Sequence, residues 1–417
     1  MMFSMANLTT NAHRLRRMTG RDPNQSHRAA TPLELLFDLA FVLAIGQAAG
    51  EFSHLVAEGH VASALAGFAF AMFTVCWAWI NFSWFASAFD TDDWFYRLMT
   101  MVQLIGVVVV ALGIPAVFDS VDEGHHIDNR VVVIGYVIMR VAVLVQWLRA
   151  AREDPKRRAT ALSYARFIAI AQVGWAVVAF VGLDLWQAVF IAVALFGFEM
   201  LGPVVSERKT DGTPWNPHHI AERYGLLTII TLGEGIFGTV ATVSAIVGES
   251  GWTIEPVLVI IAGIGLTFGL WWNYFLLPSA QVLARTRRKA WVWGYGHMVI
   301  LAAVAATGGG LHVAAYVIAG ESELGAIGAV VAVAIPVLVF CGALFVLYGF
   351  LVERFDPFHV WLVAGTVVVL VAAVVLAALG ASIGICLVVV MIAPTIVIVG
   401  YETIGHRHEA QFLAPKR

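Results

Sequence analysis

The sequence predicts an all-α integral membrane protein with about twelve transmembrane helices, arranged as two parallel six-helix repeats with both termini in the cytoplasm. Three observations lead to this prediction: the composition, the number of apolar segments, and the distribution of basic residues. Of the 417 residues, 60% are hydrophobic and only 13% are charged, and the mean hydropathy is +0.83. Soluble domains carry about 25% charged residues, so this composition is typical of a multi-span membrane protein.

Charge and cysteine content exclude several other classes. The net charge of −3 gives no indication of a nucleic-acid partner. The three cysteines, Cys76, Cys341 and Cys386, lie within apolar segments, so we expect small core residues rather than disulfides or metal ligands. No short apolar region precedes position 33, so no cleaved signal peptide is expected and the first long apolar segment would direct insertion.

Apolar runs of about 20 residues each are long enough to cross a bilayer. Charged or turn-forming residues separate most of them, whereas the boundaries near Leu183 and Gly380 are tight. The predicted spans are 33–51, 61–88, 94–117, 129–149, 160–182, 185–205, 219–247, 254–277, 290–318, 324–351, 358–379 and 381–402.

The basic residues support this count. With twelve spans, 21 of the 25 Lys and Arg residues fall in or beside the termini and the loops on one side, including the runs at 152–158 and 285–289. The opposite loops hold only Arg130. Because positively charged loops stay in the cytoplasm, we predict a bacterial plasma-membrane protein with cytoplasmic termini.

The two halves of the chain resemble each other. Gly46-Gln47 matches Gly233-Glu234, and the aromatic-Asn end of the second span matches that of the eighth, at Asn81 and Asn273. An even number of spans per half predicts parallel repeats. The predicted parts are a cytoplasmic tail (1–30), a first repeat (31–206), a linker (207–218), a second repeat (219–402) and a cytoplasmic tail (403–417).

Charged residues inside the spans are costly and need partners. At about 1.5 Å per residue, Glu34 and Asp38 lie within roughly 10 Å of the cytoplasmic end of the first span, on one helix face. Glu199 is predicted at a similar depth, and Arg140 is long enough to reach that layer. We expect an Asp38–Arg140 ion pair, with Glu199 as the alternative partner of Arg140, acting as a gate or as a structural lock.

Glu234 is predicted much deeper, about 20 Å along the seventh span. Glycines flank it, Thr231 precedes it by one helical turn, and no cation is near in sequence. Desolvation favours the protonated form of such a carboxyl group. We therefore predict a proton, cation or substrate site at Glu234, with Gln47 of the other half as a hydrogen-bond partner.

Other polar and aromatic residues allow a functional and a structural interpretation. His297 lies inside a span and could titrate near neutral pH or be a satisfied core residue. Glu222 and Arg223, like Glu34, could belong to the ion-pair layer or simply favour a helix start. Trp77 and Trp79 are interpreted as interfacial aromatic residues at a span end.

Two segments carry a family resemblance. Glu34-Leu-Leu-Phe-Asp38-Leu-Ala-Phe-Val resembles a signature of the bacterial low temperature requirement protein A family, and the segment from Glu222-Arg-Tyr-Gly to Leu-Gly-Glu234 resembles its second signature. Leu36 replaces the usual Phe, and Gly235 replaces the usual Ser and removes a hydroxyl beside Glu234. The resemblance implies a polytopic membrane protein connected with growth in the cold, and no settled activity.

The leading hypothesis is a proton-linked secondary transporter of a small solute or ion, with membrane lipids as its surroundings. The sequence contains no P-loop, nucleophile elbow or metal-binding helix, so we expect no catalytic residue, metal or cofactor. Two alternatives stay open: an intramembrane enzyme that acts on a lipid or isoprenoid through Glu34, Asp38 and Glu222, and a non-catalytic membrane sensor or cold-adaptation protein.

Overall fold

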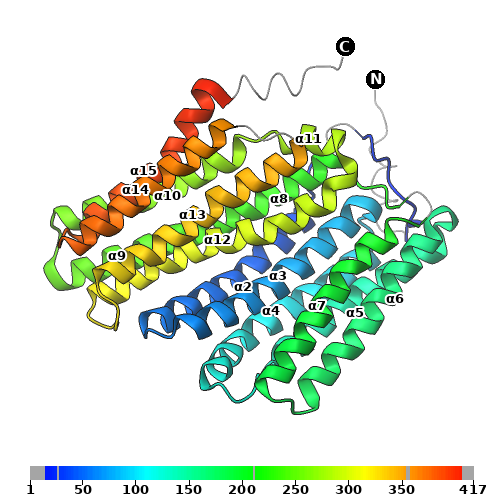
Figure 1. The fold of residues 1–417 in the computed structure, drawn as a ribbon. Helices are drawn as coiled ribbons and strands as arrows, with labels where there is room; N and C mark the ends of the chain where they lie inside the picture. Colours follow the sequence, from blue (N-terminus) through cyan, green and yellow to red (C-terminus); the bar gives the residue numbers. More distant parts are fainter. Residues whose placement is uncertain (1–14, 26–27, 210–211, 354–356, 406–417) are drawn as a thin grey trace, which may run out of the picture. The chain divides into compact units, whose positions relative to one another are not determined.

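The computed structural model describes residues 15–25, 28–209, 212–353 and 357–405, and all regular secondary structure within these ranges is helical (Figure 1). Within them, twelve helices are long and apolar enough to cross a membrane, which confirms the predicted number of spans. Many large apolar side chains are exposed, among them Leu112 (72%) and Phe190 (77%). In water such surfaces would be a liability, whereas in a bilayer they face lipid.

The helices fall into two compact units, and the first comprises Met1–Ala44 and Thr74–Arg223. Its long helices pack in chain order, α4 on α5, α5 on α6 and α6 on α7. The helices that lie entirely within this unit are α4 (Trp94–Glu123), α5 (Arg130–Glu153), the 3-10 helix η1 (Pro155–Arg157), α6 (Arg158–Phe180) and α7 (Leu185–Ser206).

The second unit comprises Ile45–Phe73 and Tyr224–Arg417. Here α12 packs against both α9 and α13, and α15 packs against α10 and α14. Its own helices are α9 (Gly233–Ser250), α10 (Ile254–Phe275), α11 (Ser279–Arg285), η2 (Arg287–Lys289), α12 (Ala290–Ile318), α13 (Ala326–Val352), α14 (Pro357–Ala378), α15 (Ile383–Gly400) and the π-helix η3 (Tyr401–Gly405).

Three helices contribute residues to both units: α2 (Pro32–Ala57), α3 (Val61–Phe89) and α8 (Pro217–Thr231). The borders between the units therefore fall inside helices and not in the predicted 207–218 linker. The six-plus-six repeat and the orientation of the termini stay predictions.

The two tightest predicted boundaries are real turns. Gly182 separates α6 from α7 with φ of 64°, and Gly380 separates α14 from α15 with φ of 85°. Both values lie in the left-handed region, which costs glycine little because it has no Cβ. Each pair of spans can thus be joined by a very short loop.

The described part of the predicted N-terminal tail is bound to the first unit. The buried side chain of Met18 anchors it. Its backbone N–H groups donate to acidic side chains: that of Arg16 to Asp93 (3.1 Å), that of Met18 to Glu153 (2.5 Å) and that of Gly20 to Asp154 (2.9 Å). The segment is thus part of the folded unit, while residues 1–14, 26 and 27, like 406–417 of the C-terminal tail, lie outside the described residues.

Asp93 is the centre of this attachment. It caps α4 by accepting from the backbone N–H of Tyr96, and Arg149 donates to both of its oxygens, at 3.1 and 2.6 Å. Burial opposes ionisation, but the hydrogen bonds from Arg149, Tyr96 and Arg16 outweigh it and lower the pKa of Asp93 to about 2. Asp93 is therefore a fixed negative charge that holds the N-terminal segment to α4 and α5.

Candidate functional site

The first signature segment meets the beginning of the second one in the first unit, which includes Glu222 and Arg223. Thr31 and Glu34 form a capping box at the start of α2: the backbone N–H of Thr31 donates to Oε2 of Glu34 (2.8 Å), and the N–H of Glu34 lies 3.3 Å from the Thr31 hydroxyl. Glu34 therefore stabilises the start of α2, which is one of the two roles predicted for it. Its carboxylate also faces α8, where His219 Nε2 lies 3.2 Å from Oε1.

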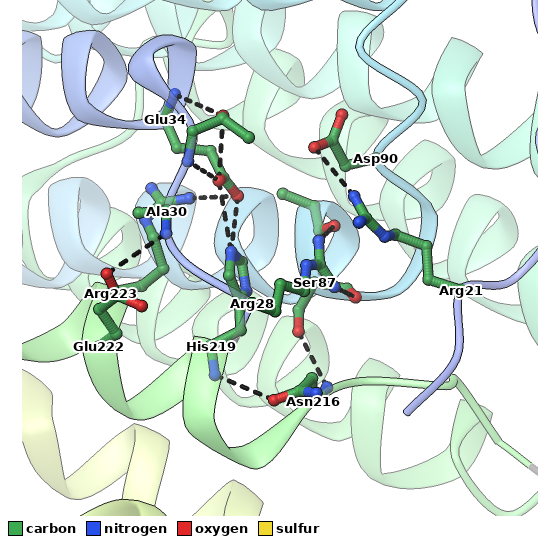
Figure 2. A network of polar contacts seen from close by, with 12 residues as sticks. Arg21, Arg28, Ala30, Glu34, Ser87, Asp90, Asn216, His219, Glu222 and Arg223 are labelled. Carbon is green, nitrogen blue, oxygen red and sulfur yellow. Dashed lines mark hydrogen bonds and ion pairs between the residues drawn. The ribbon is translucent and has the colours of Figure 1, made fainter. Parts of the chain in front are cut away.

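Arg223 joins the two acids of the first signature, and Figure 2 shows its contact with Glu34. Its Nη1 lies 2.9 Å from Oε1 of Glu34, and its Nη2 donates to Oδ1 of Asp38 at 2.5 Å. A second bond, from Nε to Oδ2 of Asp38 (3.3 Å), makes the Asp38 contact bidentate. All three side chains are at most 1% exposed.

A tryptophan completes this group. The indole N–H of Trp79, which is fully buried in α3, donates to Oδ1 of Asp38 at 2.6 Å. The guanidinium carbon of Arg223 lies 5.6 Å from the centre of the Trp79 ring, which adds a cation–π contact. We call Glu34, Asp38, Trp79, His219 and Arg223 the Arg223 cluster. This cluster contains two carboxylates, the permanently charged Arg223 and one histidine.

Polar contacts surround the Arg223 cluster (Figure 2). Arg28 donates to the carbonyl groups of Ser87 and Ala86 at the end of α3, and burial lowers the pKa of this arginine to about 10. The Asn216 side chain accepts from the backbone N–H groups of His218 and His219, and so caps the start of α8. These contacts fix the ends of the helices that carry the cluster.

Asp90 provides a pH-dependent prediction at the edge of this group. Burial raises its pKa to about 6, and the negative charge of Glu34 adds to the effect. A carboxyl group with a higher pKa in the folded state stabilises the fold fully below its unfolded value, near 3.9, and loses that contribution as the pH rises through about 6. Asp90→Asn should therefore raise the melting temperature more at pH 8 than at pH 5, where only about half of the effect is present.

Melting curves of the purified protein at both pH values test this expectation. Asp119→Asn is the matched control, because Asp119 is an exposed carboxylate of the same unit. Equal shifts for Asp90→Asn at pH 5 and pH 8 would contradict the assignment.

A second buried group is centred on Glu199 of α7. Its Oε2 accepts from the indole of Trp77 (2.5 Å) and the hydroxyl of Tyr136 (2.6 Å). Its Oε1 accepts from the indole of Trp175 (3.0 Å) and the amide of Gln172 (3.3 Å). We call these five residues together with Arg140 the Glu199 cluster.

Arg140 pairs with Glu199 and not with Asp38. The Nη2 atom of Arg140 lies 3.3 Å from Oε2 of Glu199, and both side chains are at most 3% exposed. The predicted Asp38–Arg140 pair is thus wrong, and the alternative partner is the correct one. The physical reason is helix adjacency: α5, which carries Arg140, packs on α6 and α6 packs on α7, whereas Asp38 meets α8.

Glu234 lies in the second unit, in the first turn of α9. It is 7% exposed, and no described residue forms a hydrogen bond or an ion pair with its carboxyl group in the structure. Glycines line the space around it: a Cβ at Gly46 would lie 2.8 Å from Oε1 of Glu234, and one at Gly308 of α12 would lie 2.6 Å from its Cβ. Gly46 thus leaves room for the carboxyl group, and Gly308 lets α12 lie close to the backbone of Glu234.

The predicted neighbours of Glu234 have other partners. Gln47 donates to Glu51 at 2.8 Å, so the adjacent Gly46, and not Gln47, faces Glu234. The Thr231 hydroxyl donates to the carbonyl of Leu227 (2.8 Å). Because residues 46 and 47 point in different directions on a helix, a pairing inferred from aligned repeats can miss by one residue.

His297 and Glu222 also have defined places. His297 Nδ1 contacts the carbonyl of Trp293 (2.7 Å), which can only accept, so Nδ1 carries the proton and a neutral ring accepts at Nε2 from the hydroxyl of Tyr274 (3.0 Å). Glu222 is exposed, and its carboxylate accepts from the backbone N–H of Ala30 (3.3 Å). His297 is thus a satisfied core residue, and Glu222 binds the entry to α2.

The sequence interpretation missed the tryptophans of α3. Trp77 and Trp79 were expected at the membrane interface but are 0% exposed, and each donates to a buried carboxylate. A buried indole N–H needs an acceptor. Two tryptophans beside a buried-acid layer could therefore have been interpreted as its hydrogen-bond donors.

Twelve apolar helices with two internal charge clusters are those of a polytopic membrane protein. Glu34 and Asp38 of the first signature segment form ion pairs with Arg223 of the second. The chain belongs to the family described as bacterial low temperature requirement A protein (LtrA), whose model matches residues 29–394. No curated protein matches the chain. The family match spans both clusters and Glu234.

Proposed function

We propose that the protein is a proton-linked secondary transporter of a small solute or ion in the bacterial plasma membrane. One observation carries the proposal: Glu234 is buried inside the second unit, and its carboxyl group has no ionic or hydrogen-bonding partner among the described residues. An unpaired carboxylate inside a membrane is expensive, and such residues commonly mark proton or ion pathways. Protonation removes the cost, so Glu234 would bind and release a proton in the transport cycle.

The helix that carries Glu234 is irregular at this point. α8 ends at Thr231 and α9 begins at Gly233, and the N–H of Gly235 bonds the carbonyl of Leu232 (3.1 Å), three residues back. Such a bond winds the chain more tightly than an α-helix, and short stretches of this kind within a helix often mark hinges. A hinge next to the titrating group offers a way for proton binding to change the conformation.

The proposed orientation has both termini in the cytoplasm. Exposed basic residues support this orientation, because positively charged loops stay in the cytoplasm. They lie at the turn between α5 and α6, with Arg152 and Arg158, and at the turn before α12. The two charge clusters are internal to the first unit. We therefore assign them to the stability of that unit and place the proton site at Glu234 alone.

Proton flux into liposomes that contain the purified protein and an internal pH-sensitive dye tests the proposal, with a panel of small amino acids, sugars and inorganic ions as solutes. Glu234→Gln should abolish solute-dependent proton movement, because the amide cannot exchange a proton. Glu249→Gln is the matched control, an exposed acid on the same helix, and it should leave the flux unchanged.

Gly46→Ala offers a test that keeps the carboxyl group. The added methyl group would push against Oε1 of Glu234 and displace it, so we expect a several-fold slower flux. Gly50→Ala, on the same helix with no atom within 4 Å of the added Cβ, should be neutral. Absence of proton flux with every solute would refute the transporter, and full flux in Glu234→Gln would refute Glu234 as its proton site.

A further inference from the structure

An arginine lies on the outer, apolar side of a membrane span in the first unit. Arg166 of α6 is exposed, and Ile170, Val173 and Val177 of the same helix are 59%, 67% and 48% exposed. These three residues follow Arg166 by four, seven and eleven positions, which places all four on one face of the helix. No described residue forms a hydrogen bond or an ion pair with the Arg166 side chain. A permanent positive charge thus lies among side chains that suit contact with acyl chains.

Arg166 lies well inside the span. α6 has 23 residues, so it is about 34 Å long and slightly exceeds the roughly 30 Å hydrocarbon core of a bilayer. Arg166 follows Arg158, the first residue of α6, by eight positions, or about 12 Å. Its Cα would therefore lie about 10 Å inside the hydrocarbon. A charge at this depth is costly unless it reaches a polar group.

The nearer membrane surface is at the start of α6. The Cα–Cβ bonds of an α-helix tilt toward its N-terminus, so the Arg166 side chain leans toward Arg158 and can extend to the headgroup region, as long basic side chains do. Two further cations lie at that end: Arg158 and Lys209 are exposed and have no ion-pair partner among the described residues. The Thr160 hydroxyl donates to the carbonyl of Lys209 (2.8 Å), which places Lys209 beside the first turn of α6.

We propose that this end of α6 binds the phosphate group of an anionic phospholipid, with Arg166 contacting it from the hydrocarbon side and Arg158 and Lys209 from the aqueous side. The planar guanidinium group of arginine can donate two parallel hydrogen bonds to phosphate oxygens. The two outer cations favour a net negative headgroup over a zwitterionic one. The apolar face that continues from Arg166 contacts the acyl chains. This site lies in the first unit and does not depend on Glu234 or on proton transport.

Charge complementarity favours a lipid over a second copy of the chain on this face. α6 contains no acidic residue, and Glu199, the only acid of α7, is buried in the Glu199 cluster. Glu207, which follows α7, already accepts from the hydroxyls of Tyr164 (2.7 Å) and Thr213 (2.7 Å). Two copies that packed through α6 and α7 would therefore leave Arg166 without a carboxylate, whereas a phospholipid brings a phosphate to it.

Lipid binding to the purified, delipidated full chain tests the proposal, by native mass spectrometry and by the melting temperature with phosphatidylglycerol or phosphatidylcholine. We expect the wild-type protein to retain phosphatidylglycerol and to melt at a higher temperature with that lipid. Arg166→Gln should lower this retention at least about fivefold, because the innermost charge on the phosphate is lost. Arg152→Gln is the matched control, since Arg152 is an exposed arginine near the end of α5, and it should retain the lipid.

A second variant separates the phosphate contact from the preference for headgroup charge. Arg158→Gln combined with Lys209→Gln should reduce the preference for phosphatidylglycerol over phosphatidylcholine by about fivefold per charge, while Arg166 still binds the phosphate of either lipid. Without lipid, Arg166→Gln should melt like the wild-type protein, because its side chain has no partner among the described residues.

Four results would overturn the proposal. They are unchanged lipid retention in Arg166→Gln, a much lower melting temperature of lipid-free Arg166→Gln, equal stabilisation of the wild-type protein by glycerol 3-phosphate, and a dimer that Arg166→Gln dissociates without any effect on lipid.

Discussion

Arg223→Gln is expected to lower the free energy of unfolding of the first unit by about 3–5 kcal/mol, the usual cost when one partner of a buried ion pair is removed. Arg223 is the only described arginine or lysine that pairs with Glu34 or Asp38. Without it, two carboxylates remain in a region that is at most 1% exposed. A large drop in the melting temperature of the detergent-solubilised protein is the expected result.

The control for this change is Arg208→Gln, because Arg208 is exposed in the same unit. The physical cause can be separated from lost packing with the triple variant Arg223→Met, Glu34→Gln and Asp38→Asn, which removes all three charges together. It should be more stable than Arg223→Gln alone, because no unpaired charge stays buried. A triple variant that is less stable than the single one would contradict the explanation.

Glu199→Leu is expected to have a comparable effect, about 3–5 kcal/mol. The change removes the shared acceptor of four donors, the indoles of Trp77 and Trp175, the Tyr136 hydroxyl and the Gln172 amide, and it leaves Arg140 buried without its carboxylate. Nε and Nη1 of Arg140 already have no hydrogen-bond partner among the described residues. The same melting measurement tests the prediction.

A double-mutant cycle identifies the electrostatic part of this loss. Glu199→Leu combined with Arg140→Met should recover part of the stability that Glu199→Leu loses, whereas Glu199→Gln, which retains one acceptor oxygen, should cost less than Glu199→Leu. Purely additive effects of the changes at positions 199 and 140 would show that the two side chains do not depend on each other.

Much of the fold could be predicted from the sequence because the membrane simplifies the problem. A spanning segment must satisfy its backbone hydrogen bonds internally, so apolar runs of sufficient length become helices. This rule predicted the twelve spans, including the tight turns near Leu183 and Gly380 that Gly182 and Gly380 form. The N-terminal segment was missed, because its attachment uses backbone N–H groups and leaves no apolar pattern.

The candidate site was predicted less well. Residue depth along each helix correctly marked Glu34, Asp38, Arg140 and Glu199 as buried polar residues. Depth does not tell which helices are neighbours or which face each presents. The sequence therefore could not decide whether Arg140 pairs with Glu199 or with Asp38. It also could not show that Gly46, and not Gln47, lies beside Glu234.

Composition, hydropathy and short motifs were enough to predict the class of protein, the number of spans, the family signatures and the presence of unusual buried charges. These properties depend on local composition and on the energetic cost of polar groups in lipid. The partners of these charges depend on the three-dimensional packing: Arg223 pairs with Glu34 and Asp38, Arg140 pairs with Glu199, and Glu234 has no ionic partner among the described residues. Ion pairs act over a few ångströms, so they depend on helix packing that brings distant segments together.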